Sequence, residues 1–239
     1  MSQIVGNGTL RNRQENKLYP YEMRLLDMKN IEEIMSLQYE ILSAMKDTDV
    51  CVAMTDSEVT DILNGLGEMV GVFVDNTLVA VGASLFPGDR EDNLGRDIDL
   101  CDAELMKVAH LEFAAVHPLY RGNSLQKIVA GYLVKSIAEA GRFEFILNTI
   151  SPLNPVSLDT GFYLGLHIRK LLVKYGGLIR YILFCDTKNP VITDSDTLIS
   201  VHSSDFIKQQ ELLELGYYGI GFENGLKSGH ILFGKVVRE

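Results

Sequence analysis

Residues 109–140 read AHLEFAAVHPLYRGNSLQKIVAGYLVKSIAEA, and this stretch decides how the chain folds. The apolar run from Leu111 to Val116, interrupted by Glu112, has the length of a buried strand. Pro118 ends it, because proline has no N–H for a sheet ladder. After a turn of small residues, apolar side chains recur at helical spacing: Leu125, Ile128, Val129, Tyr132, Leu133 and Ile137. The segment therefore predicts a strand, a turn and a helix.

The turn 120–125 falls at the N-terminus of the expected helix. The first N–H groups of a helix have no partner within the helix and carry a partial positive charge. A helix N-terminus with small residues and a nearby cation, here Arg121, is a place where phosphate binds. The same pattern also occurs in ordinary strand–helix connections, so both interpretations stay open.

The sequence of this turn resembles a known motif. Residues 116–126, Val-His-Pro-Leu-Tyr-Arg-Gly-Asn-Ser-Leu-Gln, resemble motif A of the GNAT N-acetyltransferase superfamily, Val-x-Pro-x-Tyr-Arg-Gly-x-Gly-x-Gly/Ala. In that family the amides of the turn bind the pyrophosphate of acyl-coenzyme A. Ser124 and Gln126 depart from the glycine, and the glycine or alanine, usual at their positions. The resemblance implies acetyl-CoA as co-substrate and no metal, with these cofactor-binding residues: Ala115, Val116, Arg121, Gly122, Asn123, Ser124, Leu125 and Gln126.

A second motif of the same family resembles residues 154–165. Asn154 and Ser157 match its Asn-x-x-Ser start, which implies that they contact the cofactor, and Gly165 matches the glycine eleven residues after the asparagine. The tyrosine that the family often uses as a proton donor would fall at Gly161, which has no side chain. Tyr163 follows two residues later and is the candidate catalytic tyrosine.

Two candidate bases, His110 and Glu112, lie in the central strand. With a side-chain period of two they share a face with Ala114 and Val116, unless a bulge intervenes. An ionised carboxylate is costly to bury in an apolar strand unless it is paired or reaches water. GNAT enzymes often place a general base here, so the resemblance implies that one of the two deprotonates an ammonium substrate. The alternative is a structural carboxylate, paired with a lysine or facing a helix N-terminus.

Composition limits the possible partners and locations. The 239 residues are 46% hydrophobic and 23% charged, as in ordinary globular proteins. A net charge of −10 at pH 7 argues against a nucleic-acid partner. We find no apolar run of membrane-spanning length and no signal-peptide core, so we expect a cytoplasmic protein without a membrane partner. Cys51, Cys101 and Cys185 lie far apart and predict reduced, mostly buried thiols.

The remaining sequence predicts three parts. Residues 1–20 are expected to be a mobile tail, residues 21–186 the acyltransferase core, and residues 187–239 a C-terminal extension packed on the same domain. In the core, residues 21–26 predict a first strand, followed by a helix capped by Asp27 or Asn30 and a short helix from Ser57. Residues 69–74 and 78–85 predict a hairpin around Asp75-Asn76.

The segments around and after the central helix complete the expected fold. The acidic segment 87–104 is longer than most connections, and it is either a solvated insertion or a loop that gates a site and recruits a cationic substrate. Residues 143–150 predict a strand parallel to the central one through a right-handed crossover. Residues 167–173 and 178–185 predict two more strands, residues 205–215 a helix, and residues 230–233 a last strand. We therefore predict an α/β GNAT fold: a central mixed β-sheet flanked by helices, with parallel central strands splayed around the acyl-CoA site.

These features together predict an N-acetyltransferase. It would transfer acetyl from acetyl-CoA to a primary amine of a small molecule or peptide by direct attack, with a second copy of the chain as a homodimer partner. Two alternatives stay open. The first is a catalytically weak acyl-CoA-binding or sensing module of the same fold. The second is an N-acyl amino acid synthase that uses longer acyl donors.

Overall fold

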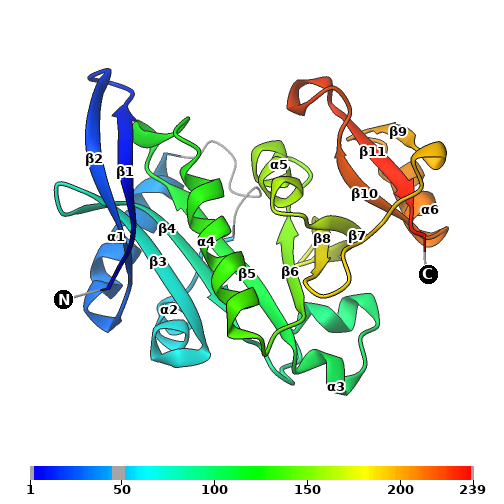
Figure 1. Cartoon of the computed structure of the whole chain (residues 1–239), viewed down its shortest axis with the longest axis horizontal. Coiled ribbons are helices and arrows are strands. Elements are labelled where there is room, and N and C mark those ends of the chain that lie inside the picture. The colour runs from blue at the N-terminus through cyan, green and yellow to red at the C-terminus, as the bar shows by residue number, and fades with distance from the viewer. Residues whose placement is uncertain (1–2, 45–51, 238–239) are drawn as a thin grey trace. The chain divides into compact units, whose positions relative to one another are not determined.

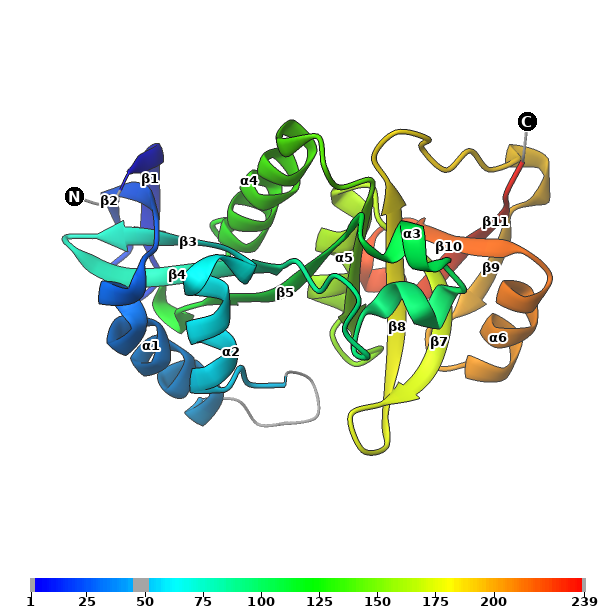
Figure 2. The same ribbon diagram turned by 90° about the horizontal axis from the view of Figure 1, so that it is seen from below.

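The computed structural model describes residues 3–44 and 52–237 of the chain, which Figures 1 and 2 show from two directions. The chain divides into two compact units. Unit 1 comprises Met1–Phe86 and Leu111–Glu139, and unit 2 comprises Pro87–His110 and Ala140–Glu239. The long strand β5 (Val108–Val116) contributes residues to both units.

Unit 1 is built on antiparallel strands in the order β1, β2, β3 and β4, which β5 follows. The first four are β1 (Ile4–Asn12), β2 (Lys17–Leu25), β3 (Gly67–Val74) and β4 (Thr77–Leu85). The hairpin predicted between β3 and β4 is present. Asp75 and Asn76 both have left-handed backbones, with φ of 48° and 61°, as a two-residue hairpin turn requires.

The N-terminal hairpin of β1 and β2 corrects a prediction. The sequence predicts a mobile tail over residues 1–20, whereas the structure pairs β1 with β2 and closes their turn through Asn12. The Oδ1 atom of Asn12 accepts hydrogen bonds from the amides of Gln14 (2.9 Å) and Glu15 (3.2 Å). Leu10 is the one apolar residue of β1 that is fully buried, so the strand carries little of the hydrophobic pattern on which the prediction depended.

Helices cover both faces of this sheet. One face packs against α1 (Ile31–Ser43) and α2 (Asp56–Asp61), and the other against α4 (Leu125–Ala140). Figure 2 shows α4 on one side of β3 and β4, with α1 and α2 on the other. Short helical turns complete the unit: η1 (Met28–Asn30), η3 (Ile62–Leu66) and η5 (Pro118–Tyr120). Asp27 caps η1, which leads directly into α1, as predicted.

Gly82 sets how closely α4 approaches the sheet. A Cβ atom at Gly82 would lie 3.0 Å from Cγ2 of Val129 and 3.3 Å from Cδ1 of Leu133. Val129 and Leu133 are both buried residues of α4. The helix therefore lies almost directly on the backbone of β4.

Unit 2 has the strand order β5, β6, β8, β7, β10, β11 and β9. Its strands after β5 are β6 (Phe145–Ile150), β7 (His167–Lys174), β8 (Leu178–Asp186), β9 (Ile199–His202), β10 (Tyr217–Phe222) and β11 (His230–Lys235). Residues 108–110 of β5 pair in parallel with residues 145–147 of β6, and the other pairs are antiparallel. The sheet is therefore mixed, as predicted.

The helices of unit 2 are short. They are η4 (Leu94–Ile98), α3 (Asp102–Leu105), α5 (Pro155–Tyr163), η6 (Ser195–Thr197), α6 (Phe206–Glu214) and η7 (Leu226–Ser228). The acidic segment predicted as a loop thus contains η4 and part of α3. Leu94 and Ile98 of η4 pack with Phe145 and Leu147 of β6 in one apolar cluster.

Residues 187–237 continue the sheet of unit 2 beyond β7. Strand β10 meets β7 at Gly219 and Ile168, and a buried polar network ties α6 to β8. The hydroxyl of Tyr181 donates to Oε1 of Gln209 at 2.7 Å, and Nε2 of Gln209 donates to the carbonyls of His202 and Ser203 at 3.0 Å each. The sequence predicted α6 and β11 but missed β9 and β10. Strand β9 has only four residues, and Gly219 and Gly221 interrupt the apolar alternation of β10.

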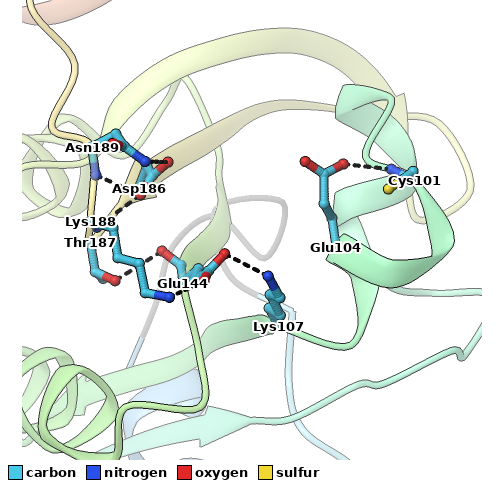
Figure 3. Close-up of polar contacts among 8 residues, drawn as sticks. All are labelled: Cys101, Glu104, Lys107, Glu144, Asp186, Thr187, Lys188 and Asn189. Atoms are coloured by element: carbon cyan, nitrogen blue, oxygen red, sulfur yellow. Dashed lines mark hydrogen bonds and ion pairs between the residues drawn. The ribbon is translucent and has the colours of Figure 1, made fainter.

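Glu144 joins the beginnings of β5 and β6 to the end of β8 (Figure 3). Its Oε2 atom lies 3.0 Å from Nζ of Lys107, and its Oε1 atom contacts Nζ of Lys188. Its carbonyl accepts a hydrogen bond from the amide of Thr187 at 2.8 Å. The ammonium groups of Lys188 and Lys107 lower the pKa of the Glu144 carboxyl.

We expect Glu144→Gln to reduce stability in a pH-dependent way. A carboxyl whose pKa is lowered on folding stabilises the protein above its unfolded pKa of about 4.3, and this contribution is lost as the pH falls through the folded pKa. Urea unfolding should therefore show the variant less stable than wild type at pH 6–7, with the difference shrinking below about pH 4.

Glu139→Gln is the matched control. Glu139 pairs with Lys135 on the exposed surface of α4, where a single ion pair contributes little. A pH dependence equal in both variants would show that the Glu144 contacts have no special weight.

Candidate functional site

The end of β5 is fixed to β4. The amide of His117 donates to the carbonyl of Val79 at 2.9 Å, after which the chain enters η5. Between η5 and α4, Gly122 and Ser124 have left-handed backbones, with φ of 86° and 57°. The turn predicted from sequence is therefore present, directly before the first residue of α4.

Ser124 explains why the related motif has glycine at its position. A left-handed backbone is uncommon for a residue with a Cβ atom, and it costs roughly 1–2 kcal/mol where glycine would adopt it freely. Arg121, Gly122 and Ser124 are all exposed, and a Cβ atom added at Gly122 would meet no atom within 4 Å. The backbone of the turn is thus accessible to a ligand.

The other predicted cofactor residues of unit 1 are less accessible through their side chains. Leu125 and Ala115 are buried in the two apolar clusters of the sheet, and Val116 is partly buried. Nε of Arg121 donates to the carbonyl of Val116 at 3.3 Å. Gln126 is partly buried in the first turn of α4. Ala115 and Leu125 expose 6% and 2% of their surface, so direct contact of these two residues with a cofactor stays a prediction.

Asn123 uses its side chain within the protein. Its Oδ1 atom accepts from the amide of Arg11 at 2.8 Å, and its Nδ2 atom donates to the carbonyls of Arg11 (2.9 Å) and Tyr120 (2.8 Å). The side chain of Asn123 is therefore used within the protein, and the predicted contact with the cofactor would have to come from its backbone.

Glu112 is exposed on β5, so its carboxylate reaches water without a large desolvation cost. The side-chain alternation of the strand breaks beside it. Leu111 packs with Ala114 and Val116 in the apolar cluster on the face of the sheet that α4 covers. Strict alternation would place Leu111 with Phe113, in the cluster on the face that α1 and α2 cover. This is the irregularity that a bulge produces, and it corrects the expectation of one regular face along the strand.

His110 is buried, with 2% of its surface exposed, in unit 2. Its Nε2 atom accepts a hydrogen bond from the amide of Leu94 at 3.1 Å. This nitrogen therefore anchors the first residue of η4. Of the two candidate bases, Glu112 has the more accessible acceptor atoms.

The second predicted motif forms the start of α5 in unit 2. Oδ1 of Asn154 accepts from the amide of Ser157 at 3.1 Å, which makes Asn154 the N-cap of the helix. Ser157 is partly buried in the first turn. Tyr163 lies at the last position of α5 with 68% of its surface exposed.

Packing explains the absence of a tyrosine at residue 161. A Cβ atom at Gly161 would lie 2.5 Å from Cδ2 of Leu183, which is fully buried in β8. Glycine lets α5 approach β8 closely, and a tyrosine would need a different helix position. The departure from the related motif is therefore a consequence of helix–sheet packing.

Each unit brings together its own part of the predicted site. Unit 1 holds Glu112 and all the motif A residues on one continuous segment, from β5 through the turn into α4. Unit 2 holds His110 on β5 and the remaining predicted residues on α5: Asn154, Ser157 and Tyr163.

Sequence reasoning missed a histidine–carboxylate pair at the end of β5. Nδ1 of His117 accepts from the amide of Leu119 at 3.2 Å, so its Nε2–H donates to Oε1 of Glu40 in α1 at 2.8 Å. It also missed Asn148 on β6, whose buried Oδ1 atom has no hydrogen-bond partner among the described residues. Neither position has a signal in the sequence, since one depends on a tertiary contact and the other on burial.

The acidic segment carries fewer unpaired carboxylates than its sequence indicates. Asp92 pairs with Arg90, Asp97 with Lys174, and Asp99 with Lys170 at 3.3 Å. Two of these pairs fasten the segment to β7 of unit 2. This favours a structural insertion over a loop devoted to attracting a cationic substrate.

Other expected features concern thiols, metals and membranes. Cys101 is exposed, contrary to the expectation of burial, while Cys185 is partly buried and burial raises the pKa of its thiol. Cys51 lies outside the described residues. Within residues 3–44 and 52–237, we find no group of three His, Cys, Asp or Glu side chains suited to a metal ion. No helix in the same ranges is both long and apolar enough to cross a membrane.

Solved structures resemble this architecture. An acetyltransferase of the GNAT family from Streptococcus pneumoniae has a TM-score of 0.52 at 12% identity, and the match covers 69% of this chain and 98% of that one. NAA60 from Arabidopsis thaliana, solved with acetyl-CoA, has a TM-score of 0.58 at 10% identity and covers 71% and 99%. This chain has the GNAT fold.

Sequence comparison adds little to the GNAT fold assignment. The chain matches no protein-family model and no curated protein. An N-acetyltransferase from Staphylococcus aureus Mu50 is 20% identical, with a TM-score of 0.53 and coverage of 71% of this chain and 99% of that one. Because the neighbours match over nearly their whole length, more than a quarter of this chain is additional to the GNAT fold they share.

We expect Gly161→Ala to destabilise the protein even though alanine favours helix. The gain in helix propensity is about 1 kcal/mol, whereas forcing a methyl group against a buried leucine costs about 1–3 kcal/mol. Urea unfolding should show a net loss of about 1 kcal/mol.

A double-mutant cycle tests the cause. Gly161→Ala should be less damaging in a Leu183→Ala background, because the truncated side chain leaves room for the new methyl group. Equal effects in both backgrounds would contradict the packing explanation.

Proposed function

We propose that this protein is an acyl-CoA-dependent N-acyltransferase that moves an acetyl group from acetyl-CoA to a primary amine of a small molecule or peptide. The observation that carries the proposal is the exposed turn 121–124 at the N-terminus of α4, in a chain with the GNAT fold. NAA60 was solved with acetyl-CoA, and the aminoglycoside acetyltransferase AAC(6')-Ib with coenzyme A and kanamycin. These neighbours support the choice of donor and the class of acceptor.

The turn has the chemistry that a pyrophosphate needs. The N-terminus of α4 carries the positive end of the helix dipole, which favours negative charge there. Arg121 supplies a full positive charge and Ser124 a hydroxyl donor, both exposed. These groups favour an anion locally in a protein whose net charge is −10.

Glu112 is the base that we assign to the reaction. An exposed carboxylate accepts a proton from the substrate ammonium, which frees the amine lone pair to attack. Acyl-CoA supplies the thioester carbonyl; the C–N bond forms, the C–S bond breaks and the sulfur leaves with the electron pair. The nitrogen then loses its second proton, which balances the proton that the thiolate takes up. A backbone amide near Val116 stabilises the developing negative charge on the carbonyl oxygen. The resemblance to the second GNAT motif also makes Tyr163 of unit 2 a candidate proton donor, and this role stays a prediction.

His110 has a different role in this proposal. Because its Nε2 atom already accepts from the amide of Leu94, protonating that nitrogen would break the contact that holds η4. We therefore propose that His110 holds η4 in place and that Glu112 is the base.

A sensing module of the same fold is the second candidate. The observation that favours it is Gly161, since packing against Leu183 removes the tyrosine that related enzymes often use. Release of free thiol from acetyl-CoA and longer acyl-CoA donors, assayed with a panel of amines, distinguishes the candidates. Binding without thiol release identifies a sensor, and release only with longer donors identifies an N-acyl amino acid synthase.

The location and assembly of the protein stay predictions. A cytoplasmic location and a homodimer are both compatible with an acyltransferase of this kind. Sedimentation of the purified chain tests the dimer, and fractionation of its native cells tests the location.

Ser124→Asp should weaken acetyl-CoA binding by at least about tenfold, because it places a negative charge beside the phosphates. Ser124→Asn is the matched control, since asparagine has nearly the same shape and also tolerates a left-handed backbone. Calorimetric titration of both variants decides the question. Similar affinities for the aspartate and asparagine variants would argue against phosphate binding at the turn.

Glu112→Gln should lower kcat by about 10²–10⁴ while acetyl-CoA still binds, because that range is the usual contribution of a general base. The acidic limb of the pH–rate profile should disappear with it. His110→Gln is the comparison: a drop confined to that variant would transfer the role to the histidine. Unchanged turnover in folded Glu112→Gln would remove Glu112 from the mechanism.

A further inference from the structure

We infer that Asn123 is a positioning residue through which the N-terminal hairpin holds the phosphate-binding turn in its binding conformation. The inference rests on the proposed function, because it concerns the same turn. It assigns β1, a strand with no counterpart among the predicted elements, to the cofactor site as its support.

The contacts of Asn123 use the full hydrogen-bonding capacity of its amide hydrogens. Its Oδ1 atom accepts from the amide of Arg11, and its Nδ2 atom donates once to the carbonyl of Arg11 and once to that of Tyr120, all at 2.8–2.9 Å. A primary amide has two N–H donors, and both are occupied. The side chain therefore serves the protein and leaves the phosphates to the backbone.

The partner of Asn123 is the outer edge of β1. Arg11 lies opposite Leu18 of β2, and β1 is the last strand of the sheet on this side of unit 1. In an antiparallel pair, alternate residues direct both backbone groups away from the partner strand. Asn123 meets such a residue with one acceptor and one donor, so its side chain pairs with β1 as an additional strand would.

Two further contacts make the support rigid. The amide of Arg13 donates to the carbonyl of Leu119 at 2.8 Å, so η5 is also tied to the hairpin. Leu10 is 1% exposed and belongs to the same apolar cluster as Leu125 and Val129 of α4. The hairpin thus contacts the connection before the turn, the turn itself and the helix after it.

The turn needs such support because of its backbone. Asn123 lies between Gly122 and Ser124, which are both left-handed. A strained conformation of this kind persists only where surrounding contacts hold it. Without the contact to β1, the loop would sample other conformations, and acetyl-CoA would have to select the competent one at a cost in affinity.

The first test is Asn123→Ala, compared with wild type by calorimetric titration with acetyl-CoA. We expect Kd to rise about tenfold, the equivalent of one or two hydrogen bonds. KM for acetyl-CoA should rise in parallel, while kcat at saturating acetyl-CoA stays near the wild-type value. A loss of general stability alone would not produce this separation of KM from kcat.

A matched pair at Arg11 tests the same contact from the other side. Arg11→Pro removes the backbone N–H that donates to Oδ1 of Asn123. Arg11→Ala keeps this N–H and removes the arginine side chain, as the proline variant also does. Proline is tolerated on an edge strand where its nitrogen faces away from the ladder. Arg11→Pro should bind acetyl-CoA about fivefold more weakly than Arg11→Ala, which gives a result even if Asn123→Ala does not fold.

The outcomes separate this inference from the function on which it rests. Wild-type protein that does not bind acetyl-CoA overturns the proposed function and the inference with it. If wild type binds acetyl-CoA and folded Asn123→Ala binds it equally well, the inference alone is overturned. The same holds if Arg11→Pro and Arg11→Ala bind acetyl-CoA with equal affinity. Weaker binding with kcat retained supports both.

Discussion

The sheet of unit 1 is buried on both faces, and the rest of that unit depends on this constraint. Val72, Ala80 and Val81 have no exposed surface, although they belong to neighbouring strands and point to different sides. Burial of apolar surface contributes about 25 cal/mol per Å², so a face of this sheet left in water would lose that stabilisation. Helices cover both faces. The helix on one face is α4, and Gly82 lets it lie directly on β4. That contact places α4, while Asn123 joins the turn before it to β1.

The elements with strong local patterns could be predicted from sequence, and those that depend on distant contacts could not. The hairpin at Asp75-Asn76 and the capped start of α1 follow from turn and cap chemistry, which involve neighbouring residues. Strand β1 has two glycines and mostly polar side chains, so its pairing with β2 becomes evident only in three dimensions. The contact between His117 and Glu40 joins residues 77 positions apart and has no signature in either segment.

The candidate site shows the same division between local and distant causes. The sequence identified the turn itself, because glycine, serine and arginine before an apolar helical stripe have a local meaning. It did not show that Asn123 is committed to a residue 112 positions away, or that Leu183 excludes a side chain at residue 161. A motif therefore names positions, while the side chains that remain available to a ligand depend on how the fold uses them.

The strands added after β7 change which backbone edges unit 2 offers to other proteins. Strand β7 has β8 on one side and β10 on the other, and β10 pairs with it at Gly219 and Ile168, near the start of β7. The strand that ends the order in this unit is β9, which has only four residues. Short edge strands protect a sheet against aggregation by strand addition. At the β9 end, unit 2 therefore offers a partner little backbone edge on which to extend the sheet.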